Sequence, residues 1–249
     1  LGGYTVVLSN ANNFVGPLIV DHNAGGLLRA DLAGALGGSG NVTISNGTLR
    51  VPPGWSFSTQ SNRQGLVTGN GSFWTNNLEF YVANGASASN NTLTVDSGAQ
   101  FYCGNGGFVA NNGSANALIV TNGGQCTLGG NWGAVGANAA ANNILVVTGT
   151  GSVLRVPVNF LAVGGGAGNV LRIEKGGLFN GYVYLGGNNE SVIVTNGGRI
   201  EGGSVGAGLL TGGAVKFAEH PERFRQHCCE NQAGVRSGQL LFNQPAGRA

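Results

Sequence analysis

The sequence predicts an all-β protein: a single right-handed parallel β-helix, or β-solenoid, with coils of about 25 residues. Three observations support this fold class. A short segment of apolar and polar residues ending in glycine recurs seven times, its apolar residues alternate with polar ones, and Asn and Gly stand at fixed distances from it. Repeats of roughly 20–50 residues are typical of solenoids, because each unit buries its apolar face only against its neighbours.

The anchor of each repeat is the last apolar residue before the polar pair and glycine. Leu93 and Val95 alternate with Thr94 and Asp96, the period of a strand with one buried face. Connections between parallel strands are right-handed, which sets the expected winding. The anchors are spaced by 21 to 28 residues and are Ile44, Val67, Val95, Val120, Val147, Ile173 and Val194.

A second apolar position follows each of the last six anchors by 11 to 16 residues. We therefore expect two β-segments in each coil, separated by glycine-rich turns, with Val, Leu and Ile columns inside. These second positions are Val82, Val109, Val135, Val163, Leu185 and Val205.

Two polar columns support this register. Asn91, Asn116, Asn143 and Asn169 each lie four residues before an anchor, and Glu190 takes the next place. Stacked Asn side chains form hydrogen bonds along the axis of cross-β structures, so a ladder is expected. Glycines three residues after the anchors should adopt positive φ in turns. They are Gly47, Gly98, Gly123, Gly176 and Gly197.

Three regions differ in composition. Residues 1–50 carry N-terminal strand repeats, residues 51–213 carry the Gly- and Asn-rich solenoid, and residues 214–249 form a non-repetitive charged tail. A helical face in residues 217–230 predicts a short helix that caps the solenoid. Alternatively, the tail is disordered or non-native sequence.

The first region resembles a known family. Residues 9–16 (SNANNFVG), 35–40 (ALGGSG) and 46–49 (NGTL) are similar to the autotransporter-associated β-strand repeat, also called the passenger-associated transport repeat; Asn10 stands where the family has Gly. The resemblance covers about one fifth of the chain. It implies a right-handed β-helical passenger on a bacterial surface or in a secreted protein, where such repeats are associated with export.

Composition excludes several other classes. The chain has 12 basic and 10 acidic residues and a net charge of +2, with no basic stripe for nucleic acid. No apolar run approaches the roughly 18 residues of a membrane span. The glycine runs lack the Asp of calcium-binding nonapeptides and the Gly-Lys-Ser/Thr of a phosphate-binding loop.

Catalysis on polysaccharides requires two carboxylates a few Å apart, or a Lys or Arg base beside acids or a metal. The outward position after each anchor is mostly Ser or Thr, and its two acids, Asp96 and Glu174, lie three coils apart. At about 4.8 Å per coil they are separated by roughly 14 Å. We therefore expect no enzyme activity and no cofactor; the Ser, Thr and Asp of this column start turns.

The Cys and His residues do not form a recognisable metal site. His220, His227, Cys228 and Cys229 lack the paired spacing of a tetrahedral zinc site. Cys103 and Cys126 lie on adjacent coils but in offset columns, which argues against a disulfide without settling it, and the state of the tail cysteines is also open.

Aromatic residues concentrate between positions 55 and 81. Trp55, Trp74 and Tyr81 are the candidate contacts for a glycan, because such rings stack on sugars. The alternative, which we favour, is that these rings fill a wide coil or cap the core.

The function predicted from these features is structural or adhesive. We expect a non-catalytic β-helical passenger segment of a large bacterial extracellular or cell-surface protein, part of a longer polypeptide, with glycans or a neighbouring cell surface as candidate partners. The alternative is a carbohydrate-binding or polysaccharide-degrading β-helix, similar to pectate lyases.

Overall fold

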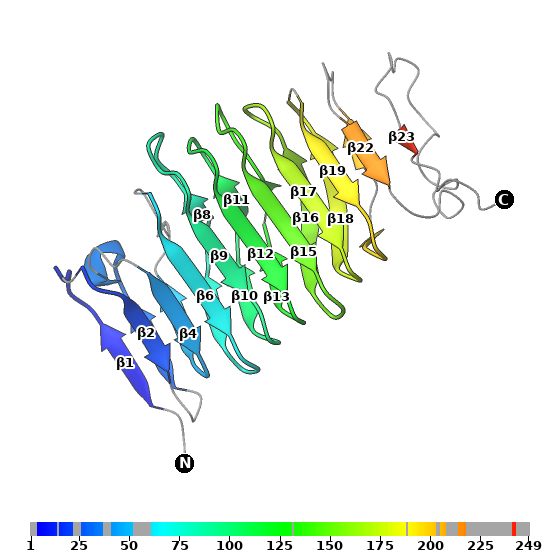
Figure 1. Cartoon of the computed structure of the whole chain (residues 1–249). Helices are drawn as coiled ribbons and strands as arrows, with labels where there is room; N and C mark the ends of the chain where they lie inside the picture. The colour runs from blue at the N-terminus through cyan, green and yellow to red at the C-terminus, as the bar shows by residue number, and fades with distance from the viewer. Residues whose placement is uncertain are drawn as a thin grey trace.

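The computed structural model is a parallel β-solenoid, and the predicted fold class is confirmed. Its strands stack along one axis, with β1 (Thr5–Leu8) near one end and β23 (Leu241–Phe242) near the other (Figure 1). The described residues are 4–13, 15–21, 26–36, 41–51, 61–130, 132–187, 189–202, 205–207, 214–217 and 241–242.

The anchors lie on a 10-stranded parallel sheet, here called sheet B. Adjacent strands pair in register, so that Val95, Val120 and Val147 are direct partners. The strands in spatial order are β2 (Leu18–Asp21), β4 (Val42–Ser45), β6 (Gln64–Thr68), β9 (Thr92–Val95), β12 (Ala117–Thr121), β15 (Ile144–Thr148), β17 (Val170–Glu174), β19 (Ser191–Val194), β22 (Ala214–Phe217) and β23.

The remaining strands form a 13-stranded sheet, sheet A. Its first part contains β1 and the strands that each follow a strand of sheet B in the sequence: β3 (Leu27–Ala30), β5 (Thr48–Val51), β7 (Phe73–Asn76), β10 (Gln100–Cys103), β13 (Gln125–Leu128), the start of β16 (Val153–Val163), the start of β18 (Leu178–Leu185) and β20 (Arg199–Glu201). Its second part contains β8 (Phe80–Ala83), β11 (Gly107–Ala110), β14 (Gly133–Ala134), the ends of β16 and β18, and β21 (Val205–Ala207).

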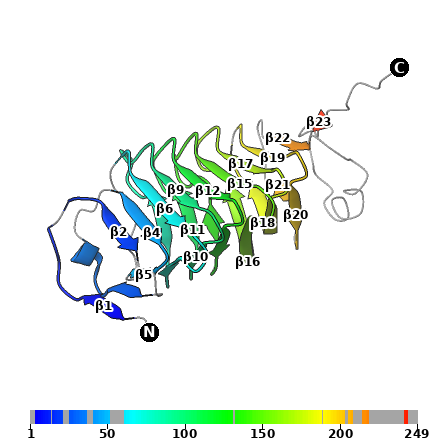
Figure 2. The same ribbon diagram turned by 60° about the horizontal axis from the view of Figure 1, so that its bottom comes forward.

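From β6 onward a full coil therefore contains three strand segments and not the two predicted (Figure 2). The predicted second position lies in or beside the third segment, as Val82 and Val109 show. The middle segment was missed. In β16 and β18 the middle and third segments join into one long strand, with a register shift between Val156 and Phe160 where Pro157 lacks an N–H for the ladder.

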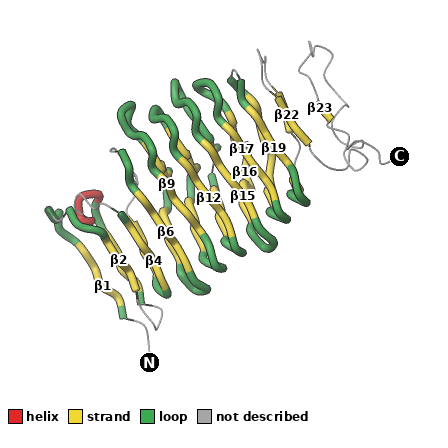
Figure 3. The backbone as a smooth tube through the Cα atoms, in the orientation of Figure 1, coloured by secondary structure: helices red, strands yellow, loops and turns green. Residues whose placement is uncertain are grey.

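Helical structure is confined to one 3₁₀ turn, η1 (Ala33–Leu36), among the described residues (Figure 3). No helix in the described part of the chain is long and apolar enough to cross a membrane.

Side chains along each strand point alternately into and out of the solenoid, and the inward ones form its core. On sheet B, Leu93 and Val95 are buried, whereas Thr94 and Asp96 lie at the surface in part, as predicted. The inward residues of both sheets form one continuous core cluster from Val20 to Val194. Each coil thus covers the apolar face of the next, and the core has no break along the axis.

The glycine column makes tight turns between sheet B and sheet A. In the turn after β12, Gly124 N donates to Thr121 O at 2.8 Å, while Asn122 and Gly123 have φ of 48° and 81°. Two consecutive positive φ values define a type I′-like turn, which favours Asn and Gly. Positive φ is confirmed at Gly98, Gly123, Gly176 and Gly197; in the first repeat Asn46 adopts it, and Gly47 does not.

The predicted Asn ladder is present and completely buried. Nδ2 of each Asn donates to Oδ1 of the next: Asn91 to Asn116 at 3.1 Å, Asn116 to Asn143 at 3.1 Å, and Asn143 to Asn169 at 2.9 Å. The same oxygens also accept backbone N–H groups of the preceding coil. The ladder therefore satisfies buried polar groups along the whole central stack.

Glu190 continues the ladder with a carboxyl group. Its Oε1 lies 3.4 Å from Asn169 Nδ2, and Oε2 is buried without a hydrogen-bond partner. The residue is only 1% exposed. Burial raises the pKa of Glu190 from 4.5 to about 7, although hydrogen bonds from Asn169 act in the opposite direction.

Sheet B extends past residue 213, where the repeat was expected to end. β22 pairs in parallel with β19, and β23 pairs with β22. In this pairing Val215 and Phe217 of β22 continue the columns of Val192 and Val194. The predicted tail helix at 217–230 begins on the last residue of β22, and the rest of it lies outside the described residues.

Candidate functional site

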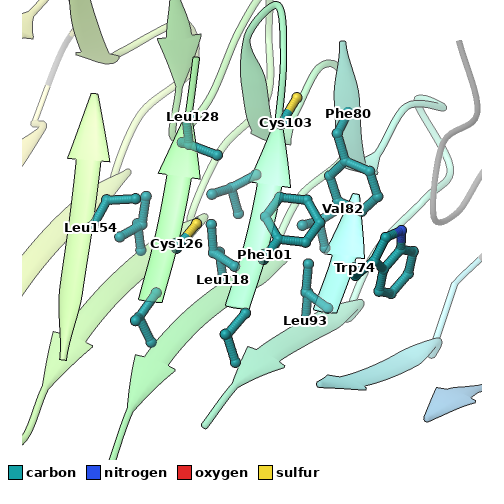
Figure 4. Packing of buried hydrophobic residues seen from close by; sticks show 14 of the residues in the cluster. Trp74, Phe80, Val82, Leu93, Phe101, Cys103, Leu118, Cys126, Leu128 and Leu154 are labelled. Atoms are coloured by element: carbon teal, nitrogen blue, oxygen red, sulfur yellow. The ribbon is translucent and has the colours of Figure 1, made fainter. Parts of the chain in front are cut away.

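Trp74 lies inside the solenoid and is wrong as a glycan contact. Its side chain is 0% exposed and packs edge-on against Phe80 and Phe101, with ring centroids 5.5 and 5.9 Å apart (Figure 4). Phe80 and Phe101 also contact each other at 4.8 Å. These rings fill the wide coil, the alternative that the sequence favoured, and no sugar reaches Trp74 in this packing.

Tyr81 points away from Phe80 because neighbouring residues of a strand face opposite sides. Its ring stacks on Phe108 at 4.8 Å and 16°, and its hydroxyl donates to Glu79 Oε2 at 2.5 Å. Burial, followed by this hydrogen bond, raises the pKa of Tyr81 above its usual range. Trp132 meets Phe108 edge-on at 4.8 Å. Tyr81 therefore belongs to a small aromatic cluster with the buried Phe108 and the exposed Trp132, whereas Trp55 lies outside the described residues.

The two carboxylates considered for catalysis occupy the predicted places. Asp96 follows β9 and Glu174 ends β17, three strands away in sheet B. Glu174 Oε1 lies 3.5 Å from Thr148 Oγ1, its neighbour on the adjacent strand. A separation of roughly 14 Å between the two acids follows from the strand spacing, which is too long for a retaining or inverting pair.

The described cysteines are free and buried. Cys126 pairs in register with Phe101, and Cys103 with Leu128, so the two thiols lie in offset positions as expected. Cys103 Sγ lies 2.8 Å from the carbonyl oxygen of Leu78 and 2.7 Å from that of Gly106, which share its single S–H as acceptors, and burial raises its pKa to about 12. Burial raises the pKa of Cys126 as well. Neither thiol has the thiolate character of a nucleophile.

Metal-ligating side chains do not gather in the described part of the chain: no group of three or more His, Cys, Asp or Glu is present there. The candidates in the tail, His220, His227, Cys228 and Cys229, lie outside the described residues.

A shallow groove of about 270 Å³ lies on sheet A. Tyr102, 39% exposed, stands in it beside Phe73 and Gln100. On the other side, Arg155 Nη1 donates to Gln125 Oε1 at 2.8 Å. The lining residues are Phe73, Gln100, Phe101, Tyr102, Gln125, Thr127 and Arg155.

The groove was not predicted from the sequence, because its residues come from β7, β10, β13 and β16, the middle segments that were not predicted as strands. The alternation Gln100-Phe101-Tyr102-Cys103 was the available signal. The groove, with an exposed ring, amides and a guanidinium, can bind polar or anionic ligands.

Comparison with protein-family models, with curated proteins and with solved structures finds no match to this chain.

Proposed function

We propose that this chain is a structural and adhesive β-solenoid segment of a bacterial extracellular or cell-surface protein, and that it has no catalytic role. The observation that carries the proposal is the unbroken core from Val20 to Val194. A stack whose every coil covers the next behaves as a rod, and each added coil lengthens it by about 4.8 Å. Such a rod holds other parts of a protein at a distance.

The contacts of the solenoid also suit a chain that is exported before it folds. Every strand pair in sheet B joins segments neighbouring in the stack, such as β12 with β9 and β15. Each coil can therefore fold onto the previous one as it emerges, without waiting for distant sequence. The similarity of residues 4–50 to passenger-associated repeats supports the same role.

Surface display tests this proposal. The chain is placed between a secretion leader and an autotransporter translocator barrel in a Gram-negative host. We expect antibody labelling of intact cells, and reduced labelling when residues 1–50 are deleted, because the resemblance links this region to export. The comparison uses equal amounts of barrel in the outer membrane. Retention of the full chain inside the cell, while an established passenger on the same barrel reaches the surface, would contradict the proposal.

A further inference from the structure

Five successive strands of sheet A place Arg50, Thr75, Tyr102, Thr127 and Arg155 in one outward column. The partners in register are Arg50 with Thr75, Thr75 with Tyr102, Tyr102 with Thr127, and Thr127 with Arg155. Arg50, Tyr102 and Arg155 are exposed. We call this set the Arg–Tyr–Arg column.

The spacing of the column leaves room beside the central ring. Tyr102 is two strands from each arginine, so the Cα atoms are separated by about 9.6 Å on either side. The intervening residues, Thr75 and Thr127, have short side chains. The groove of about 270 Å³ lies on the Arg155 side of the Arg–Tyr–Arg column. Its lining also includes Phe73 and Gln100, which are partners in register in the adjacent column.

A hydrogen bond to Gln125 holds the Arg155 side chain at the groove. Gln125 Oε1 accepts its hydrogen bond at 2.8 Å, and Gln125 Nε2 donates to the carbonyls of Gly151 at 2.7 Å and Gly123 at 3.1 Å. Two backbone carbonyls therefore orient the amide, and the amide orients the guanidinium. A guanidinium with fixed orientation presents its remaining N–H groups to an anion with little loss of conformational entropy.

The outer face of sheet A carries an excess of positive charge at the Arg–Tyr–Arg column. Arg29 pairs with Asp31 at 2.7 Å, and Arg199 pairs with Glu201 at 3.5 Å, on either side of it. Strands β5, β7, β10, β13, β16 and β18 contain no Asp or Glu. The column is thus positive with an exposed aromatic ring at its centre, a combination that favours an anionic ligand with an apolar face.

We propose that the Arg–Tyr–Arg column binds an acidic oligosaccharide that runs along the solenoid axis. The Tyr102 ring stacks on the C–H face of one sugar, and Arg50 and Arg155 bind carboxylates of sugars on its two sides. Gln100 and Thr127 lie within the same groove to bind hydroxyl groups. This inference rests on the adhesive part of the proposed function and names the class of ligand that is bound. Ligand binding at this site does not require that the chain be exported.

Binding of an alginate hexasaccharide to the purified chain, measured by titration calorimetry at low salt, tests the proposal. We expect binding of the hexasaccharide and at least tenfold weaker binding of neutral cellohexaose. Tyr102→Ala and Arg155→Gln should each weaken alginate binding at least fivefold, and raised salt should weaken it further because the attraction is between charges.

Matched variants separate the column from general surface effects. Tyr182→Ala removes a ring of similar exposure, 37%, on the later part of β18, and Arg199→Gln removes an arginine already paired with Glu201. Both should bind alginate as the unchanged chain does. No alginate binding, equal binding of cellohexaose, or equal losses in the control variants would overturn the proposal. Circular dichroism of each variant shows whether the fold is kept. The result of the surface-display experiment does not depend on alginate binding, so the two proposals can fail separately.

Discussion

Val120→Asp should unfold the centre of the solenoid. Val120 is 0% exposed and lies between Val95 and Val147 on the adjacent strands. A carboxylate at this place is either charged in an apolar interior or protonated there at a cost, and its hydrogen-bonding groups have no partner. We expect a loss of about 4 kcal/mol or more in the free energy of unfolding.

Ile119→Asp is the matched control, because residue 119 is the adjacent strand position and faces outward. Its effect should stay below about 1 kcal/mol, since the new carboxylate remains in water. Urea denaturation followed by circular dichroism measures both, and hydrogen exchange shows whether β9 and β15 lose protection together with β12 in Val120→Asp. Equal stability of the two variants would mean that Val120 is not inside a shared core.

Glu190→Gln should remove a pH dependence from the stability of the chain. The pKa of Glu190 is about 7 in the folded state, against 4.5 as the ordinary value, so the folded state binds the proton more tightly. The stability that this group contributes is therefore fully present below about pH 4.5 and is lost as the pH rises to 7. The shift corresponds to roughly 3 kcal/mol by linkage.

The amide variant keeps an acceptor for Asn169 and carries no charge at any pH. At pH 8 it should be more stable than the unchanged chain by up to about 3 kcal/mol, and near pH 4 the two should be similar. Thermal unfolding from pH 4 to pH 8 measures this difference. Glu201→Gln, which removes an exposed carboxyl paired with Arg199, is the control for the loss of one negative charge. Parallel profiles for Glu190→Gln and the unchanged chain would contradict this account.

The sequence predicted the fold class and the register of sheet B, because these depend on local periodicity. Alternation at Leu93 and Val95 predicts the buried face, and the Asn residues four positions before the anchors predict the ladder. Both signals repeat every coil and need no tertiary information.

The candidate site was harder to predict, because it depends on which strand pairs with which. Trp74 and Tyr81 lie in one aromatic stretch, yet Trp74 points into the core and Tyr81 points out, and the sequence pattern did not separate them. Arg50 and Arg155 are far apart in the chain and share a column only through the register of five strands. Because the middle strand of each coil was not predicted, the groove that these strands form was not predicted either.

The distance between two spin labels on sheet B shows whether the chain is a regular stack of parallel coils. Thr43→Cys and Ile193→Cys occupy one outward column, six strand steps apart, and Thr43→Cys and Val146→Cys are four steps apart. Cys228 and Cys229 are replaced by Ser, and the free thiols of Cys103 and Cys126 are buried, so that the labels react at the introduced positions. At about 4.8 Å per step, the Cα separations are about 29 and 19 Å.

Pulsed electron–electron double resonance should show one narrow distance distribution for each pair, centred near these values once the label linkers are included, and the two distances should scale with the number of steps. Broad distributions, or distances that do not follow the number of coils between the labels, would contradict the solenoid and the structural role proposed for it.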